Sequence, residues 1–195
     1  MKKDVEIEVS ARHIHLSKED YSLLFGAETA FNNIHELSQK NQFATDKVVR
    51  IIGPNNDLPA RFLSPFRDRT QVELSLTDCF DIGISAPYKI SVDDDATEIK
   101  ISGSEGEITR RAAIITKRHL HIDQQSATAF GIKDGSNIAL DIKTDRGKLS
   151  YDDIEVKVRS DFQLRVHLDT DEGNAAGIKQ KTIGELIIAE NDISN

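Results

Sequence analysis

Two short stretches of the chain repeat one pattern of residue types, and each could bind a metal ion. The pattern is arginine, histidine, aliphatic, histidine, aliphatic and a residue that can cap a helix, at residues 12–17 and 118–123. Four of the six histidines lie in these stretches: His13, His15, His119 and His121. In an extended segment, residues i and i+2 point to the same side, so each pair places two imidazoles about 6–7 Å apart along the backbone. Each stretch is therefore predicted to be a two-ligand clamp.

A pair of histidines does not complete a metal site. Zn²⁺ prefers four ligands, and a catalytic site leaves one position for water or substrate. Glu73 and His167 are candidates for the third ligand, because both stand on polar faces of predicted strands. We expect two open sites, one of His13, His15 and Glu73 and one of His119, His121 and His167. These ligand types favour two Zn²⁺ ions, with Co²⁺ or Mn²⁺ as substitutes.

The clamps and several other residues each have an alternative interpretation. A single His-x-His on a strand is usually an ordinary polar face, and it is the duplication that favours a metal. Arg12 and Arg118 face away from the paired histidines, and either ion pairs or a substrate role would suit them. His35 has no partner at clamp spacing and is expected on the surface or in packing. Cys79 is expected in the core rather than as a nucleophile.

A phosphate oxyanion beside an open metal site would need a guanidinium close by. Arg67 lies in the loop that leads into the strand of Glu73. Arg61 and Arg69 are rivals for the same role, and a solvated position on the surface is the alternative for each.

Composition excludes several classes of function. The net charge of −8 argues against general nucleic-acid binding, which needs a basic face. No apolar run is long enough for a signal peptide or a membrane span. The single cysteine excludes an internal disulfide framework, and we expect a cytoplasmic protein. Phosphate-binding glycine loops and a nucleophile elbow are absent from the sequence.

Alternating apolar and polar residues predict many short strands. After each clamp a capping residue, Ser17 or Asp123, should start a short helix that ends at Gly26 or Gly131. One further helix should be capped at Thr77-Asp78, and another should run from an acidic first turn at 169–172 to Gly177. Strands are predicted at 3–12, 47–52, 59–63, 70–76, 97–102, 107–117, 136–143, 147–158, 161–168 and 184–189.

This repeated organisation predicts a mainly β fold of two small β-barrels in a pseudo-twofold arrangement, with short helices. We expect the first domain at about residues 1–92, with the first clamp and Glu73. The second domain, 93–195, would hold the second clamp and His167.

Four ordered motifs resemble the phosphate propanoyltransferase family of phosphotransacylases. They are Val-Ser-Ala-Arg-His-Ile-His-Leu-Ser at 9–17, Thr-Gln-Val-Glu at 70–73, Arg-His-Leu-His at 118–121 and Val-His-Leu-Asp-Thr-Asp-Glu-Gly-Asn-Ala-Ala-Gly at 166–177. The resemblance runs from about residue 5 to residue 178. It implies two β-barrels, two zinc ions between them, and exchange of coenzyme A for phosphate on a short acyl group.

The resemblance also implies roles for particular residues. The two zinc ions would be bound by the two groups of ligands named above, and Arg67 would bind phosphate as the catalytic residue. Contacts to coenzyme A would come from Glu8, Val9, Ser10, Arg61 and Asn174.

The chain departs from the family pattern in three places. Gly53-Pro54-Asn55-Asn56 stands where Gly-Pro-Lys-Gly is frequent, so a lysine that could meet a coenzyme A phosphate is missing. Thr116-Lys117 stands where Ala-Ala is frequent. The chain begins almost at its first strand, without the amphipathic extension that sends some members into bacterial microcompartments. A free enzyme is therefore favoured over one in a microcompartment.

The expected reaction is attack by inorganic phosphate on the thioester of acetyl- or propanoyl-coenzyme A, giving acyl phosphate and free coenzyme A. One alternative is a zinc-dependent hydrolase of thioesters or phosphoesters, with water in the open position. Another is a non-catalytic double barrel held together by metal. The sequence does not fix acyl-chain length, reaction direction or oligomeric state, and a homo-oligomer stays open.

Overall fold

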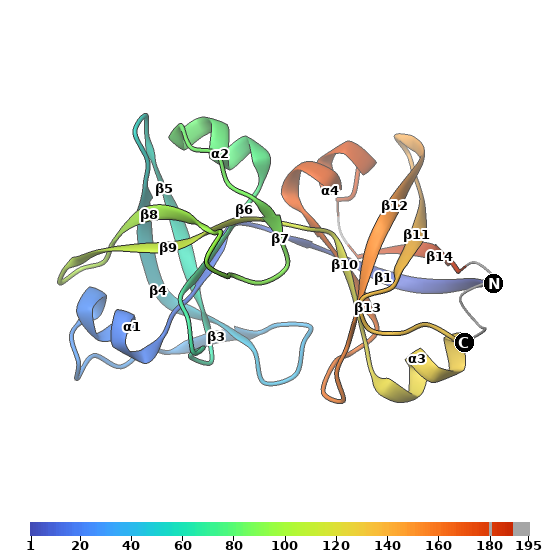
Figure 1. Ribbon diagram of the computed structural model, residues 1–195, viewed down its shortest axis with the longest axis horizontal. Coiled ribbons are helices and arrows are strands. Elements are labelled where there is room, and N and C mark those ends of the chain that lie inside the picture. The colour runs from blue at the N-terminus through green and yellow to red at the C-terminus, as the bar shows by residue number, and fades with distance from the viewer. Residues whose placement is uncertain (180, 189–195) are drawn as a thin grey trace. The chain divides into compact units, whose positions relative to one another are not determined.

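The computed structural model describes residues 1–179 and 181–188, and strands are its main element (Figure 1). The strands form two closed β-barrels, each a ring of six, so the predicted mainly β fold of two small barrels with short helices is confirmed. By its internal contacts the chain divides into two compact units. The central unit is Ala11–Thr116, and the terminal unit joins Met1–Ser10 to the described residues from Lys117 onward.

The barrel of the terminal unit closes through strands that are far apart in sequence. Its first strand pairs in parallel with the strand of His167 and antiparallel with the last strand. Around the ring the order is β1 (Lys2–Ser10), β13 (Arg165–Asp169), β10 (His119–Ile122), β12 (Gly147–Val158), β11 (Asn137–Thr144) and β14 (Thr182–Ile187).

The barrel of the central unit has the same plan. Its ring runs β9 (Glu107–Thr116), β6 (Gln71–Leu74), β2 (His13–His15), β5 (Asp57–Ser64), β4 (Phe43–Ile52) and β8 (Thr97–Ser102), and β8 pairs with both β4 and β9 to close it. Two short strands, β3 (Asn33–Glu36) and β7 (Tyr88–Lys89), pair with β4 and β9 from outside the ring. In both rings the clamp strand lies between one parallel and one antiparallel neighbour.

The units do not divide where the expected boundary at residues 92 and 93 lies. Strand β1 belongs to the terminal unit, since Val5 and Ile7 are buried in its core. Strands β8 and β9 belong to the central unit, where Ile101 and Ile108 are buried. Alternation in the sequence locates such strands but does not name their partners, which here lie more than a hundred residues away for β1. The two clamps and their third ligands nevertheless fall in separate units, as expected.

The ends of the strands largely follow the predicted pattern. Strands β8 and β12 have the predicted bounds, whereas β13 begins four residues later than expected. The delay has a local cause, because the N–H of Phe162 donates to the carbonyl of Arg159 (3.1 Å) and closes a turn there. The last strand was predicted to reach residue 189, which lies outside the described residues.

Each barrel has its own hydrophobic core. In the central unit five aromatic rings pack together, with centroids 5.0 to 5.7 Å apart: Tyr21, Phe25, Phe31, Phe62 and Phe66. The core of the terminal unit is mainly aliphatic, built around Leu120, Ile122 and Val156. Full burial of one such side chain contributes about 1.5–3 kcal/mol. The apolar faces of the clamp strands thus anchor the histidines that alternate with them.

Helices follow both clamp strands, with the predicted caps. They are α1 (Lys18–Phe25) and α3 (Gln124–Phe130). Ser17 and Asp123 accept from backbone N–H groups of the first turn, and the helices end at Gly26 and Gly131. At α1 the carboxylate of Asp20 accepts from Thr70 and Arg110, so it ties the helix to the barrel.

Helices also follow both third-ligand strands: α2 (Leu76–Ile82) and α4 (Thr170–Ala176). Each starts with a reciprocal capping box, Ser75 with Asp78 and Asp169 with Glu172. The predicted cap at Thr77-Asp78 is therefore corrected by two residues, because the hydroxyl of Ser75 accepts from the N–H of Asp78. None of the helices in the described chain has the length and apolar content needed to cross a bilayer.

Helix α4 packs directly against β1 through a glycine. A Cβ built on Gly173 would lie 2.6 Å from Cγ2 and 2.7 Å from Cγ1 of Val9. Because atoms cannot approach so closely, Gly173 is needed for this contact, although glycine is a poor helix former.

We predict that Gly173→Ala lowers the free energy of unfolding by about 1–3 kcal/mol, the usual cost of overpacking. Urea denaturation followed by circular dichroism measures it. The double variant Val9→Ala with Gly173→Ala should recover much of the loss, because it removes the clashing methyl groups. An unchanged denaturation midpoint in Gly173→Ala would show that the helix is not packed as described.

Candidate metal centres

Strand pairing brings the third ligand of the central unit opposite the first clamp. In the antiparallel pair β2 and β6, Glu73 lies directly across from His13. Nε2 of His13 is 3.4 Å from Oε2 of Glu73, and Nε2 of His15 is 3.6 Å from Oε1. The side chain of Glu73 is only 11% exposed. The three predicted ligands therefore converge in one place, which we call the central group.

The terminal unit repeats this arrangement with an imidazole as third ligand. In the antiparallel pair β10 and β13, His167 lies directly across from His119. The ring centroids of His119, His121 and His167 are 4.5 to 5.0 Å apart. Phe162 stacks on His121 with centroids 3.9 Å apart. These three histidines form the terminal group.

Both groups fit a metal ion by donor type and spacing. In each, one potential ligand atom per residue lies within 4.8 Å of the others. Ligand atoms about 2.0–2.1 Å from a tetrahedral ion are separated by about 3.3 Å, close to the N–O distances in the central group. With three donors each, both sets leave room for a fourth ligand.

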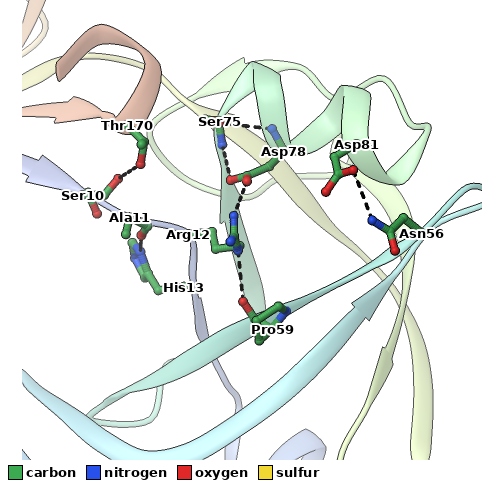
Figure 2. A network of polar contacts seen from close by, with 10 residues as sticks. All are labelled: Ser10, Ala11, Arg12, His13, Asn56, Pro59, Ser75, Asp78, Asp81 and Thr170. Atoms are coloured by element: carbon green, nitrogen blue, oxygen red, sulfur yellow. Dashed lines mark hydrogen bonds and ion pairs between the residues drawn. The ribbon is translucent and has the colours of Figure 1, made fainter. Parts of the chain in front are cut away.

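Backbone carbonyls orient the first histidine of each clamp. Nδ1 of His13 lies 2.9 Å from the carbonyl oxygen of Ala11 (Figure 2), and Nδ1 of His119 lies 2.9 Å from that of Lys117. A carbonyl can only accept, so in both rings Nδ1 carries the proton and donates it. Nε2 then keeps its lone pair for a metal ion, as in most histidine ligands.

The two arginines that precede the histidines form ion pairs with the helices after the third-ligand strands. Arg12 pairs with Asp78, and its Nε donates to the carbonyl of Pro59 (3.1 Å), as Figure 2 shows. Arg118 Nε donates to Glu172 (2.6 Å) and its Nη1 to the carbonyl of Asp152 (2.8 Å). Asp78 and Glu172 belong to the capping boxes of α2 and α4, so each arginine links a clamp to the helix that follows its third ligand.

The charges in the central group favour the metal-binding forms of His15 and Glu73, whereas at His13 they favour the protonated imidazolium, whose proton a metal ion would have to displace. Burial alone would lower the pKa of His13, but the Glu73 carboxylate outweighs it and raises this pKa above its usual value. Burial holds the pKa of His15 well below its usual value, with the charge of Arg67 adding to it. Burial alone would raise the pKa of Glu73, yet the histidines and Arg67 lower it well below its usual range. At neutral pH Glu73 is thus an anion and His15 a neutral imidazole.

Among the candidate arginines, Arg67 acts on the central group. Its backbone N–H donates to the carbonyl of Leu16 (2.9 Å), which fixes the loop beside the clamp strand. The Arg67 side chain is exposed, and its charge contributes to the pKa shifts of all three ligands. Arg61 lies opposite His13 on β5 and donates to the carbonyl of Thr45 (2.6 Å). The rival Arg69 forms an exposed ion pair with Asp94 (3.2 Å).

The residues expected to contact coenzyme A from the terminal unit lie along one strand and helix. On β1, Glu8 is in register with His167 of β13, and Ser10 is in register with Asp169. The backbone carbonyl of Ser10 accepts from Thr170 of α4 (3.4 Å), shown in Figure 2. Val9 packs on the same helix, and Asn174 is exposed on it. Arg61, the fifth of this set, belongs to the central unit.

Two further residues contact Glu73 that sequence reasoning did not select. Gln71 and Thr116 each donate a hydrogen bond to its carboxylate. The sequence held a clue to each of these contacts. Gln71 shares the strand face of Glu73, and Thr116 stands where alanine is frequent in the family. Of the residues set aside, His35 is exposed and Cys79 is buried in the central core, as expected.

Comparison with known proteins gives these groups a context. A family model described as phosphate propanoyltransferase matches residues 6–179. The chain belongs to the phosphate propanoyltransferase family. The phosphate propanoyltransferase of Alkaliphilus metalliredigens is 42% identical over 187 residues, 94% of this chain and 88% of the relative. That of Thermotoga maritima is 40% identical over 171 residues, 86% of this chain and 81% of the relative. Members of the family are phosphate acyltransferases, and this chain is an enzyme of that class.

In this phosphate propanoyltransferase family member, we predict that His121→Ala lowers the metal content by about one ion per chain, because two donors seldom retain the metal of a three-donor site. Elemental analysis of protein purified from metal-supplemented medium measures it. His35→Ala is the matched control and should retain the full content. If His121→Ala keeps as much metal as the control, the terminal group is not a metal site.

Proposed function

We propose that the protein is a phosphotransacylase that reversibly transfers an acetyl or propanoyl group between coenzyme A and inorganic phosphate, with two zinc ions as cofactors. One ion would be bound by each three-residue group. The observation that carries the proposal is that each barrel of this family member presents one such open group, built in the same way from a clamp strand and its antiparallel neighbour.

Zinc suits the donor sets better than the other common divalent ions. Imidazole and carboxylate are ligands that Zn²⁺ accepts readily in tetrahedral sites, and Co²⁺ or Mn²⁺ could replace it. When bound, the zinc ions would supply Lewis-acid chemistry toward phosphate, the thioester carbonyl and the departing sulfur.

The proposed reaction needs no covalent intermediate on the protein. An oxygen of inorganic phosphate attacks the carbonyl carbon of acyl-coenzyme A, and a C–O bond forms. The C–S bond breaks, and coenzyme A leaves as the thiolate. The products are acyl phosphate and coenzyme A, and the reverse reaction follows the same path. Phosphate is already anionic at neutral pH, so no side chain has to remove a proton from the attacking oxygen.

Arg67 is proposed to bind and orient the phosphate. A guanidinium offers two parallel N–H donors, which match two of the four phosphate oxygens and leave another oxygen free to attack the carbonyl carbon. Its exposed side chain and its electrostatic effect on the central group support this role. Such positioning turns a weak bimolecular encounter into an effectively intramolecular one.

For coenzyme A we propose contacts with Glu8, Val9, Ser10 and Asn174 of the terminal unit and Arg61 of the central unit. Support comes from the packing of β1 on α4, which gathers the first four along one strand and helix. The proposed compartment is the cytoplasm, where the free thiol of Cys79 would stay reduced.

The first test is a thiol-release assay with acetyl-, propanoyl- and butanoyl-coenzyme A. We predict that release of coenzyme A requires inorganic phosphate and that hydroxylamine traps an equivalent amount of acyl hydroxamate from the acyl phosphate. Acetyl- or propanoyl-coenzyme A should give the highest kcat/KM. Thiol release at the same rate without phosphate would identify a thioester hydrolase and overturn the proposal.

The second test is Arg67→Ala. Loss of a charged hydrogen-bond donor to phosphate costs about 1.5–3 kcal/mol, so kcat/KM for phosphate should fall about 10- to 150-fold. Initial rates over a range of phosphate concentrations measure it, and the metal content should stay at the wild-type value.

Arg69→Ala is the matched control, since this arginine lies in the same loop but forms an exposed surface ion pair. Its phosphate saturation curve should match that of the wild type. If Arg67→Ala also matches the wild type, Arg67 does not bind phosphate.

A further inference from the structure

Both oxygens of the Glu73 carboxylate accept hydrogen bonds from neighbouring side chains. Nε2 of Gln71 donates to Oε1 (2.5 Å), and Oγ1 of Thr116 donates to Oε2 (3.1 Å). The same two oxygens face the imidazoles, Oε1 toward His15 and Oε2 toward His13. The carboxylate is therefore held with one oxygen toward each histidine of the clamp.

The residues that donate these bonds are themselves fixed. Gln71 is 2% exposed and Thr116 is 7% exposed. The side-chain oxygen of Gln71 accepts from the backbone N–H of Val92 (2.7 Å), so its NH₂ group is turned toward Glu73. Thr116 is the last residue of β9, which pairs in parallel with the strand of Glu73. Neither donor can turn away from the carboxylate without losing a buried contact.

We propose that Gln71 and Thr116 are positioning residues that orient Glu73 as a metal ligand and so control how tightly the central group holds its zinc ion. The inference rests on the proposed function, in which Glu73 binds zinc. A ligand held in its binding geometry loses little conformational freedom on binding. Hydrogen-bonded neighbours of this kind commonly change metal affinity about 10- to 100-fold.

The hydrogen bonds from Gln71 and Thr116 to the third ligand are a feature of the central group. In the terminal unit the residue in register with His121 is Arg165, at the position that Gln71 occupies opposite His15. Arg165 forms an ion pair with Glu6 (2.7 Å), and the third ligand there is an imidazole. Removing the hydroxyl of Thr116 should therefore affect one of the two zinc ions.

The test is zinc release from the loaded protein to a chromophoric chelator, in wild type and in Thr116→Ala. We expect two release phases in the wild type. The variant His121→Ala is expected to lack the terminal ion, so the phase that it retains belongs to the central group. In Thr116→Ala the central phase should be about tenfold faster and the other unchanged. Gln71→Leu should accelerate the same phase.

Two control variants separate positioning from general destabilisation. Thr116→Ser keeps the hydroxyl and should restore the slow phase. Thr97→Ala removes another threonine hydroxyl of this unit, one that donates to the carbonyl of Ser85 (2.7 Å), and should leave both phases unchanged. Equal central phases in Thr116→Ala and wild type would overturn the inference, as would equal acceleration in Thr97→Ala. A wild-type protein that binds no zinc would instead overturn the proposed function itself.

Discussion

The antiparallel pairing of each clamp strand with its third-ligand strand is the constraint on which the rest of the structure depends. It sets His13 across from Glu73 and His119 across from His167, with the register fixed by apolar residues on the opposite face of each strand. A shift by one residue would turn the ligands into the core and the core residues outward. The hydrophobic effect in each barrel therefore determines the geometry of its candidate metal-binding group.

The two groups share their architecture but differ in charge. A carboxylate and two imidazoles leave a bound Zn²⁺ with a net charge near +1, whereas three neutral imidazoles leave it near +2. A zinc ion bound in the terminal group would therefore be the stronger Lewis acid of the two. Arg67 adds positive charge beside the central group, where the carboxylate has removed some. In the proposed two-zinc enzyme, this charge would restore part of the attraction for a phosphate anion that the carboxylate removes.

Local patterns in the sequence predicted much of this, because the relevant interactions are local. Ser17, Asp123, Gly26 and Gly131 cap helices through their own backbone neighbours, so their roles follow from type and spacing. The two groups of predicted ligands followed from duplication of the clamp and from the polar faces of two strands, and the strand pairing brings each group together. The partners of β1 could not be predicted, because pairing between distant strands leaves no mark in either segment alone. For the same reason Thr116 was noticed only as a departure from a family pattern, although it contacts Glu73 across the sheet.

The terminal unit is built from two separate parts of the chain, and this bears on the order in which the chain can fold. Strand β1 is synthesised before the other strands of its barrel, yet the side chain of Lys2 contacts Glu185, which follows it by 183 residues. Until the later strands of the terminal unit have been made, the apolar side chains of Val5 and Ile7 have no barrel to enter. The central unit, whose strands lie between, can close first. An unpaired strand in a nascent chain can aggregate, and charged side chains oppose this. Strand β1 carries five of them: Lys2, Lys3, Asp4, Glu6 and Glu8.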